Sequence, residues 1–362
     1  MIKTTELEKQ LNLVTRKMMV MKNSGMREKY PISLIDINCW EWPQGVGIFG
    51  LLKYYRQTGN RQIRDFLLDW FDKRMREGLP EKNVNTTSPM LTLTYLYEET
   101  QKKEYLALIR EWSDWIMRDK KLIRTGDGCF QHMITGDSND SEILIDTLFM
   151  AVLFLERAGK ILNRRDYIDE ANYQILNHIK YLLDKREGLF YHGFNFKRND
   201  NYGGILWGRG NCWYTVVIME LVQDIELDPA VKRYFLSVWK NQVRALKRYS
   251  DPACGLWHTV INDPGSYLEI SASAGFLYGI MQGVRLGIFP KEEYAALIGT
   301  ALSSIMDYIS EDGTVRNVSY GTPIGLDAEF YRTIPCCPMT YGQAMMILLL
   351  QEAMQPFWHE EG

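Results

Sequence analysis

The sequence predicts an all-α protein, built as one closed barrel of helical hairpins that spans residues 1–362. Three observations lead to this prediction. Five stretches each show apolar residues at helical spacing on both sides of a short break. The two ends of the chain add one helical pattern each, and a related glycine-containing loop follows four of the helix pairs.

The five breaks define five hairpins, in each of which an apolar helix precedes an amphipathic one. They lie at Thr58-Gly59-Asn60, near Thr100, around Gly159, at Asp228-Pro229 and at Phe289-Pro290. Proline fits the first turn of the helix that follows such a break. The amphipathic segment Glu6 to Lys22 and the apolar segment Tyr341 to Met354 supply two more helices, and pairing them closes a ring of six hairpins with twelve helices. A repeat of this length also fits an open helical solenoid.

The connections between hairpins favour the closed barrel. Four of them share the order glycine, any residue, large apolar residue, any residue, polar residue, in segments 127–132, 187–192, 254–259 and 312–317. Alternation after a glycine turn is typical of a short strand edge or an extended loop. Four such loops on one rim would wall a deep cleft, with His132 and His192 at the same position of two of them.

Composition and charge exclude several classes of partner. Lys and Arg number 42 against 45 Asp and Glu, without a long basic run, so we expect neither nucleic acid nor a membrane surface as a partner. The longest unbroken apolar run, Leu148 to Leu155, is too short to span a bilayer. Six scattered cysteines without a CxxC motif, and an N-terminal segment without an export signal, predict a cytoplasmic protein with reduced thiols. Neither the histidine spacing nor the cysteines form a ligand set, so we expect no metal and no cofactor.

Asp146 is the first candidate for a catalytic residue. In the 13 residues from Ile143 to Leu155, only Asp146 and Thr147 are polar. A carboxylate in such a run is unfavourable unless it is paired, capping or catalytic. One interpretation is the N-cap of an apolar helix. The other is a carboxyl group at the barrel mouth among apolar walls, where desolvation raises its pKa and makes it a general acid.

The segment Trp207-Gly208-Arg209-Gly210-Asn211-Cys212-Trp213 is the second candidate. Glycine lets the backbone approach a ligand, arginine offers a planar fork to a carboxylate, and tryptophan faces stack on sugar rings. A glycine-rich turn with inward tryptophans and a solvated arginine would give the same pattern. Two further residues each have two interpretations. Trp42 is either part of a site wall or part of the core, and His192 is either a structural hydrogen-bonded group or a catalyst.

These segments together resemble the unsaturated glycuronyl hydrolases, in particular the unsaturated rhamnogalacturonyl hydrolases of glycoside hydrolase family 105. The resemblance rests on segments that follow one another through nearly the whole chain: 42–47, 146–150, 188–193, 207–213, 268–273 and 321–322. It implies an (α/α)6 barrel whose substrate is a small oligosaccharide with a 4,5-unsaturated uronic acid, as polysaccharide lyases leave it. The enzyme would hydrate the double bond, and the resulting hemiketal would release the neighbouring sugar.

The resemblance also implies roles for single residues. Asp146 would protonate C4 and then activate water for C5. His192 would hold the ring hydroxyls or the water, Arg209 and Trp213 would hold the unsaturated sugar, and Trp207 and Trp42 would stack nearby. The expected substrate-binding set is Trp42, His132, His192, Trp207, Arg209, Asn211 and Trp213. His132 joins this set from the loop repeat alone. The segment Asn83 to Pro89 lacks the second aspartate expected in the glucuronyl branch, which favours a galacturonyl substrate from rhamnogalacturonan or pectin.

Three other functions fit parts of the pattern. A sugar epimerase would use His132 and His192 as an acid and base pair. A conventional glycosidase would work through two carboxylates. A helical-repeat interaction protein would form an open superhelix and grip a partner chain with its aromatic rim.

Overall fold

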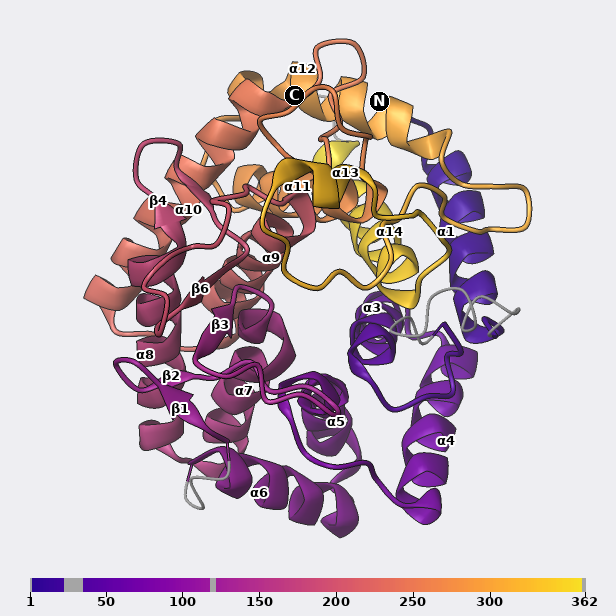
Figure 1. The fold of residues 1–362 in the computed structure, drawn as a ribbon. Helices are drawn as coiled ribbons and strands as arrows, with labels where there is room; N and C mark the ends of the chain where they lie inside the picture. The colour runs from indigo at the N-terminus through magenta and orange to yellow at the C-terminus, as the bar shows by residue number, and fades with distance from the viewer. Residues whose placement is uncertain (1, 23–34, 118–121, 360–362) are drawn as a thin grey trace.

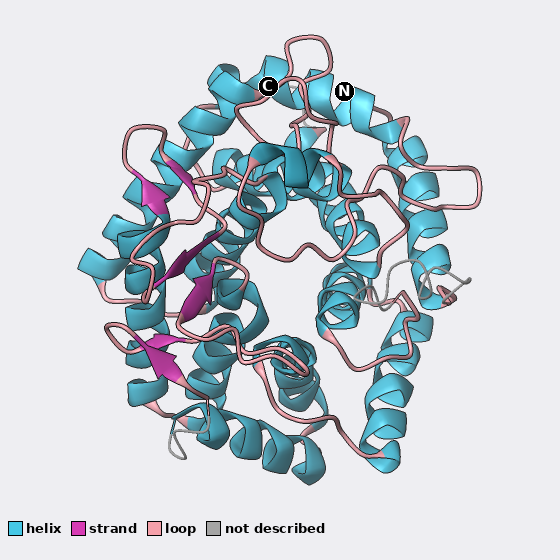
Figure 2. Ribbon diagram, viewed as in Figure 1, coloured by secondary structure: helices cyan, strands magenta, loops and turns pink. Residues whose placement is uncertain are grey.

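The structure, a computed structural model, describes residues 2–22, 35–117 and 122–359. Twelve long helices within these ranges form two concentric rings (Figure 1, Figure 2). Consecutive helices alternate between the rings, so the predicted all-α barrel of six hairpins is confirmed.

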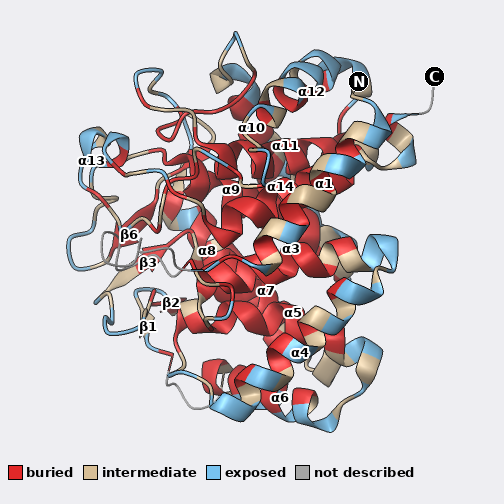
Figure 3. Ribbon diagram, turned by 90° about the vertical axis from the view of Figure 1, so that its right-hand side faces the viewer, coloured by how far each residue is buried: buried red, intermediate tan, exposed pale blue. Residues whose placement is uncertain are grey.

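The inner ring consists of helices that are buried on nearly every side (Figure 3): α3 (Trp42–Thr58), α5 (Val84–Thr100), α7 (Leu153–Leu162), α9 (Gly208–Asp224), α11 (Ile270–Arg285) and α14 (Thr340–Ala353). These helices are apolar on nearly all sides because each is covered by its neighbours in the inner ring and by the outer ring. A π-helical turn, Leu148–Val152, precedes α7 and packs against α9. Since α14 packs against both α11 and α3, the ring is closed and the open solenoid is wrong.

The outer ring consists of amphipathic helices with one exposed face: α1 (Thr4–Met19), α4 (Arg61–Glu77), α6 (Lys103–Met117), α8 (Arg165–Leu182), α10 (Pro229–Tyr249) and α12 (Lys291–Met306). The first and last long helices, α1 and α14, pack against each other. The predicted pairing of the two ends of the chain is therefore confirmed.

Four of the five predicted breaks lie between helices as expected, and the third does not. The turn between α7 and α8 lies at Asn163 and Arg164, whereas Gly159 is inside α7. A Cβ atom at Gly159 would lie 2.7 Å from Cγ1 of Ile168 in α8. The glycine is thus explained by the close approach of two packed helices.

Two of the four predicted rim loops are short antiparallel hairpins, and the loops at residues 254–259 and 312–317 are extended connections with isolated bridges. β1 (Arg124–Thr125) pairs with β2 (Cys129–Phe130), and β4 (Leu183–Asp184) pairs with β5 (Leu189–Phe190). The repeated glycine has a positive φ of between 72° and 83° in all four loops, at Gly128, Gly188, Gly255 and Gly313. Side chains other than glycine rarely adopt this conformation, which explains the repeat.

Two further rim features complete the architecture. β3 (Glu142–Leu144) pairs antiparallel with β6 (Gly193–Asn195), so that Leu144 lies opposite Gly193. The long connection between α12 and α14 contains the short helix α13 (Ala328–Arg332), and a 3-10 turn, Pro356–Trp358, follows α14. None of the helices in the described ranges is both long and apolar enough to cross a membrane.

Candidate active site

A cleft of approximately 280 Å³ opens among the rim loops. Trp42, Asn85 and Arg209 line it, and each belongs to the first turn of an inner helix, α3, α5 and α9 respectively. The cleft therefore lies at the N-terminal ends of the inner helices. Peptide dipoles give such ends a positive partial charge, which favours an anionic ligand.

Asp146 lies in the turn between β3 and the π-helical turn, where its side chain lines the cleft. Its main-chain oxygen accepts the amide hydrogens of Phe149 and Met150, so the backbone starts the helix without the carboxyl group. Oδ1 accepts a hydrogen bond from Nε1 of Trp213 at 3.1 Å. Oδ2 has no hydrogen-bond partner among the described residues and lies 3.6 Å from Nε2 of His192. The structure thus contradicts the N-cap interpretation and places Oδ2 in a buried position beside His192.

The surroundings of Asp146 change its acidity. Burial raises the pKa of its carboxyl group to about 6, although the charge of Arg209, the backbone amide of Asp146 and the hydrogen bond from Trp213 oppose the shift. Only 15% of the side chain surface is exposed. Such a group is protonated in weak acid and can donate and recover a proton near neutral pH.

His132 and His192 flank Asp146 from the two equivalent rim loops. Nδ1 of His132 lies 2.8 Å from Oγ1 of Thr147, and burial lowers the pKa of this histidine to about 3. Nδ1 of His192 lies 2.7 Å from the hydroxyl oxygen of Tyr331. Burial, Arg209 and His132 hold the pKa of His192 well below its usual value. Both imidazoles are therefore neutral near neutral pH, and neither supplies a positive charge.

Arg209 is buried between two aromatic rings and holds one wall of the cleft. Its guanidinium carbon lies 4.5 Å from the ring centroid of Trp207 and 4.8 Å from that of Tyr341. It donates to main-chain and side-chain oxygens of residues 319–322, with bonds of 2.8 to 3.2 Å to Ser319 O, Tyr320 O and Thr322 Oγ1. Glu269, which is fully buried, lies 3.9 Å away and balances the charge.

The expected tryptophans make separate ring contacts around the site. Trp42 lines the cleft and stacks on Tyr341, with ring centroids 4.7 Å apart and planes at 16°. Trp213 meets the edge of Trp42 at 6.4 Å. Trp207 lies below the cleft, where it packs on His192 with ring centroids 4.1 Å apart. Of the expected residues, Trp42, His132, Asp146 and Arg209 line the cleft. Trp213 and His192 do not line it but contact Asp146, and Trp207 packs on His192.

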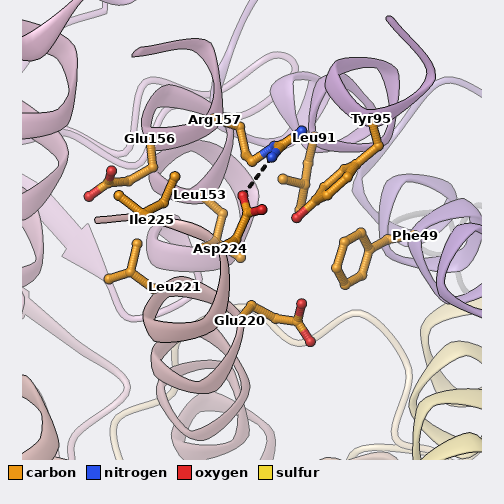
Figure 4. A pocket seen from close by; sticks show the side chains of 10 residues that line it. All are labelled: Phe49, Leu91, Tyr95, Leu153, Glu156, Arg157, Glu220, Leu221, Asp224 and Ile225. Atoms are coloured by element: carbon orange, nitrogen blue, oxygen red, sulfur yellow. Dashed lines mark hydrogen bonds and ion pairs between the residues drawn. The ribbon is translucent and has the colours of Figure 1, made fainter. Parts of the chain in front are cut away.

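The opposite end of the barrel is closed by ion pairs. Arg157 of α7 contacts Glu98 at 2.5 Å and Asp224 at 2.6 Å, and its guanidinium carbon lies 3.7 Å from the ring centroid of Tyr95. The cavity beside these residues measures approximately 10 Å³, which is the space of about one water molecule (Figure 4). A sugar ring does not fit there. Among the described residues, no group of three or more His, Cys, Asp or Glu side chains is placed to hold a metal ion.

Comparison with known proteins agrees with this architecture. The model of Glycosyl Hydrolase Family 88 matches residues 12–357. The chain belongs to this family of glycosyl hydrolases. This Family 88 chain is 32% identical over 319 residues to the unsaturated rhamnogalacturonyl hydrolase YesR of Bacillus subtilis (strain 168), with 87% of the chain and 90% of the relative covered.

Solved structures are also similar to this Family 88 chain. It superposes with a TM-score of 0.93 on a possible member of the GH105 family from Salmonella enterica serovar Paratyphi A, at 39% identity and covering 98% of this chain and 95% of the other. The unsaturated glucuronyl hydrolase of Bacillus sp. GL1 shares the fold, with a TM-score of 0.70 at 17% identity and 98% of each chain covered. The expected resemblance and the (α/α)6 barrel are both confirmed.

Asn211 requires a correction, since it does not line the cleft. It is fully buried in the Family 88 barrel, where Oδ1 accepts the amide hydrogen of Phe190 at 2.7 Å and Nδ2 donates to the main-chain oxygen of Phe190 at 2.8 Å. Phe190 is the second residue after the glycine of its rim loop. The corresponding amide of the other loops bonds to another buried polar side chain, in the pairs Phe130 with Gln174, Trp257 with Ser273 and Val315 with Gln343. Asn211 thus anchors the loop that carries His192.

Several residues of the site were not expected from the sequence. Glu142 and Leu144 line the cleft together with Asp146, because alternate residues of a strand share one face. That spacing could have been found once a strand was recognised at residues 142–144. Asp137 on the adjoining loop and Tyr331 behind His192 carry no sequence signal that relates them to the site.

Proposed function

We propose that this Family 88 protein removes a 4,5-unsaturated uronic acid of galacturonyl type from rhamnogalacturonan or pectin oligosaccharides produced by a lyase. One observation carries the proposal: the carboxyl group of Asp146, of which only 15% is exposed, lies in the cleft with a pKa raised to about 6. Hydration of an enol ether needs one group that gives a proton and then takes one. An ordinary glycosidase instead places two carboxyl groups on either side of the glycosidic bond.

The chemical steps follow from the two states of Asp146. The protonated carboxyl group transfers its proton to C4 of the unsaturated ring, and positive charge develops at C5 and the ring oxygen. The carboxylate that remains accepts a hydrogen bond from Trp213 and takes a proton from water, whose oxygen adds to C5. The hemiketal formed at C5 then opens and releases the neighbouring sugar.

The positive side of the cleft supports an anionic ring beside Asp146. The N-terminal ends of α3, α5 and α9 line the cleft, and their partial positive charges favour the uronate carboxylate, while Arg209 offers its planar guanidinium group beside them. We assign the part of Trp42 that lines the cleft to contact with the sugar, and His132 to its hydroxyl groups. Trp213 and His192 contact the acid itself, while Trp207 supports His192 from below.

The opposite wall supports a neutral leaving sugar. Asp137 and Glu142 line this part of the cleft, and Glu142 lies two strand positions beyond Leu144 on the face that leads away from Asp146. Two carboxylates repel an acidic or sulfated sugar and accept hydrogen bonds from neutral hydroxyl groups. Rhamnose has this character, which is why we propose a rhamnose leaving group.

The ultraviolet band of the conjugated enol-ether acid provides the test. Unsaturated galacturonyl-rhamnose should lose this band when the purified protein is added, and the Asp146→Asn variant should leave it unchanged. The saturated disaccharide should remain intact. Cleavage of the saturated sugar, or an unchanged band with both pectin-derived and glycosaminoglycan-derived unsaturated disaccharides, would refute the proposed reaction.

We further propose that the protein acts in the cytoplasm. Cys129, Cys212, Cys254, Cys336 and Cys337 are free thiols, and the adjacent pair at the rim is compatible with a reducing compartment. Fractionation of cells with an antibody to the protein tests this, and recovery outside the cytoplasmic fraction would contradict it.

A further inference from the structure

Tyr331 lies directly behind His192, on the side away from Asp146. It belongs to α13, within the same connection that forms the cleft wall at residues 321–324. The side chain is fully buried and packs near Trp207, with ring centroids 6.1 Å apart. Its hydroxyl oxygen is 2.7 Å from Nδ1 of His192. This connection therefore controls both the wall of the cleft and the back of the imidazole.

A second partner of the Tyr331 hydroxyl decides the direction of the bond to His192. The backbone N–H of Gly325 donates to the hydroxyl oxygen at 3.0 Å. A tyrosine hydroxyl has one hydrogen of its own, which is then available for Nδ1. If Nδ1 carried a proton instead, both neighbours would donate to the oxygen and the hydroxyl hydrogen would be buried without an acceptor. That is unfavourable, so Nδ1 is the acceptor.

The position of the His192 proton follows. A neutral imidazole has one N–H, and if Nδ1 accepts, the hydrogen is on Nε2. Nε2 lies 3.6 Å from Oδ2 of Asp146, and neither atom has a hydrogen-bond partner among the described residues. A bond of this kind is often long in the free enzyme and shortens in the complex.

We infer that Tyr331 is a positioning residue that holds the proton of His192 on Nε2, where it faces the carboxyl group of Asp146. The tautomer itself follows from the hydrogen bonds, and only the expected changes in kcat and kcat/KM rest on the proposed function. Nε2 with a hydrogen has no lone pair and cannot take the proton of Asp146, so that proton goes to C4. When it has left, Nε2–H and Trp213 both donate to the new carboxylate.

Nitrogen NMR of the full-length protein with 15N-labelled histidine tests the tautomer directly. The chain has five histidines, and the His192 signals are identified as those that disappear in His192→Gln. We expect Nε2 of His192 to be the protonated nitrogen both below and above the pKa of Asp146. A wild-type signal with the proton on Nδ1 would overturn the inference, and this result needs no variant at position 331.

The Tyr331→Phe variant keeps the ring and removes only the hydroxyl. Below the pKa of Asp146, the protonated carboxyl group can then donate to Nε2, which moves the His192 proton to Nδ1. We expect this tautomer change and a roughly 10-fold lower kcat. The hydrogen bond from the protonated carboxyl group to Nε2 also stabilises the acid form of Asp146, so kcat/KM should begin to fall at a higher pH than in the wild type. A purely structural loss would lower kcat without moving the pH profile or the tautomer.

Tyr105→Phe is the matched control. Tyr105 is also fully buried, and its hydroxyl also has two partners, since it donates to Asp72 at 2.7 Å and accepts from Nζ of Lys102 at 3.3 Å, but it lies on α6 of the outer ring. It should keep the wild-type tautomer and pH profile. A Tyr331→Phe protein that matches this control in both respects would refute the positioning role. Since the spectra need no substrate, failure of hydrolysis alone would count against the proposed function and leave the tautomer result standing.

Discussion

The indole Nε1 of Trp213 lies 3.1 Å from Oδ1 of Asp146, although the two residues come from different hairpins. The bond fixes Oδ1, while Oδ2 is buried without a hydrogen-bond partner among the described residues, 3.6 Å from Nε2 of His192. Because Trp213 is fully buried in α9, the orientation of the carboxyl group is set by the barrel core and not by the rim loops.

The activity should depend on pH through Asp146. Its pKa is about 6, so the acid form needed for transfer to C4 is present below this pH and is lost above it. We expect kcat/KM to fall about 10-fold for each pH unit above the midpoint. Initial rates from the ultraviolet band over a range of pH measure this. A profile that stays flat through this range would contradict the assignment of Asp146 as the acid.

Replacing Trp213 by Phe should move this profile to higher pH. The hydrogen bond from Trp213 lowers the pKa of Asp146, and its loss favours the protonated form. The same loss removes a donor from the carboxylate formed in the reaction, so kcat should fall by about 10- to 100-fold. Parallel pH profiles of the two proteins check both effects, and an unchanged midpoint would show that the bond does not influence the acid.

The Asp146→Asn variant should be inactive and more stable than the wild type at neutral pH. The folded pKa of about 6 lies above the ordinary value of 3.8, so the unfolded chain gains free energy by ionising as the pH rises between these values. The variant avoids this, and we expect its free energy of unfolding to be roughly 1 to 3 kcal/mol higher at pH 7, with the difference vanishing below the ordinary pKa of 3.8, near pH 3. Chemical denaturation at both pH values measures it. A variant that is less stable at neutral pH would show that burial does not destabilise the carboxylate.

Glu156 should affect stability in the same direction at the other end of the barrel. Its side chain is fully buried in α7, and its carboxyl group points away from the ion pair of Arg157 with Asp224 (Figure 4). Neither oxygen has a hydrogen-bond partner among the described residues, and burial raises its pKa to about 8. Stability should therefore decrease as the pH rises from 4.5, its ordinary pKa, to about 8. Glu156→Gln should be roughly 2 to 4 kcal/mol more stable than the wild type near pH 8 and equal to it in acid.

Glu220→Gln is the control for this variant. Glu220 is also buried but is paired, with Lys53 at 2.8 Å and with the hydroxyl of Tyr278 at 2.5 Å. Removing its charge leaves Lys53 without its partner, so this substitution should lower the free energy of unfolding. If both variants changed stability in the same direction, the contrast between unpaired and paired carboxyl groups would be wrong.

Asn211→Ala should weaken both the fold and the site. The substitution leaves the amide and carbonyl of Phe190 without their buried partner, which costs about 3 kcal/mol. Since the same loop carries His192, kcat should also fall. Ser273→Ala removes the corresponding anchor of the loop at residues 254–259. It should lower stability while leaving kcat unchanged, and thermal melting with initial rates distinguishes the two variants.

The sequence by itself determined the barrel, because its information there is local. Helical periodicity, helix breaks and the glycine that needs a positive φ depend on residues a few positions apart, and they predicted the hairpins and the rim loops. The unusual position of Asp146 in an apolar run identified it for a similar reason. Only the tertiary structure decided which side chains contact it. Asn211 was separated from the site and Tyr331 was added to it by hydrogen bonds between segments that are distant in the chain. Whether a buried polar group binds substrate or holds a loop depends on which atoms the closed barrel brings within about 3 Å of it, and residue type and spacing do not contain that distance.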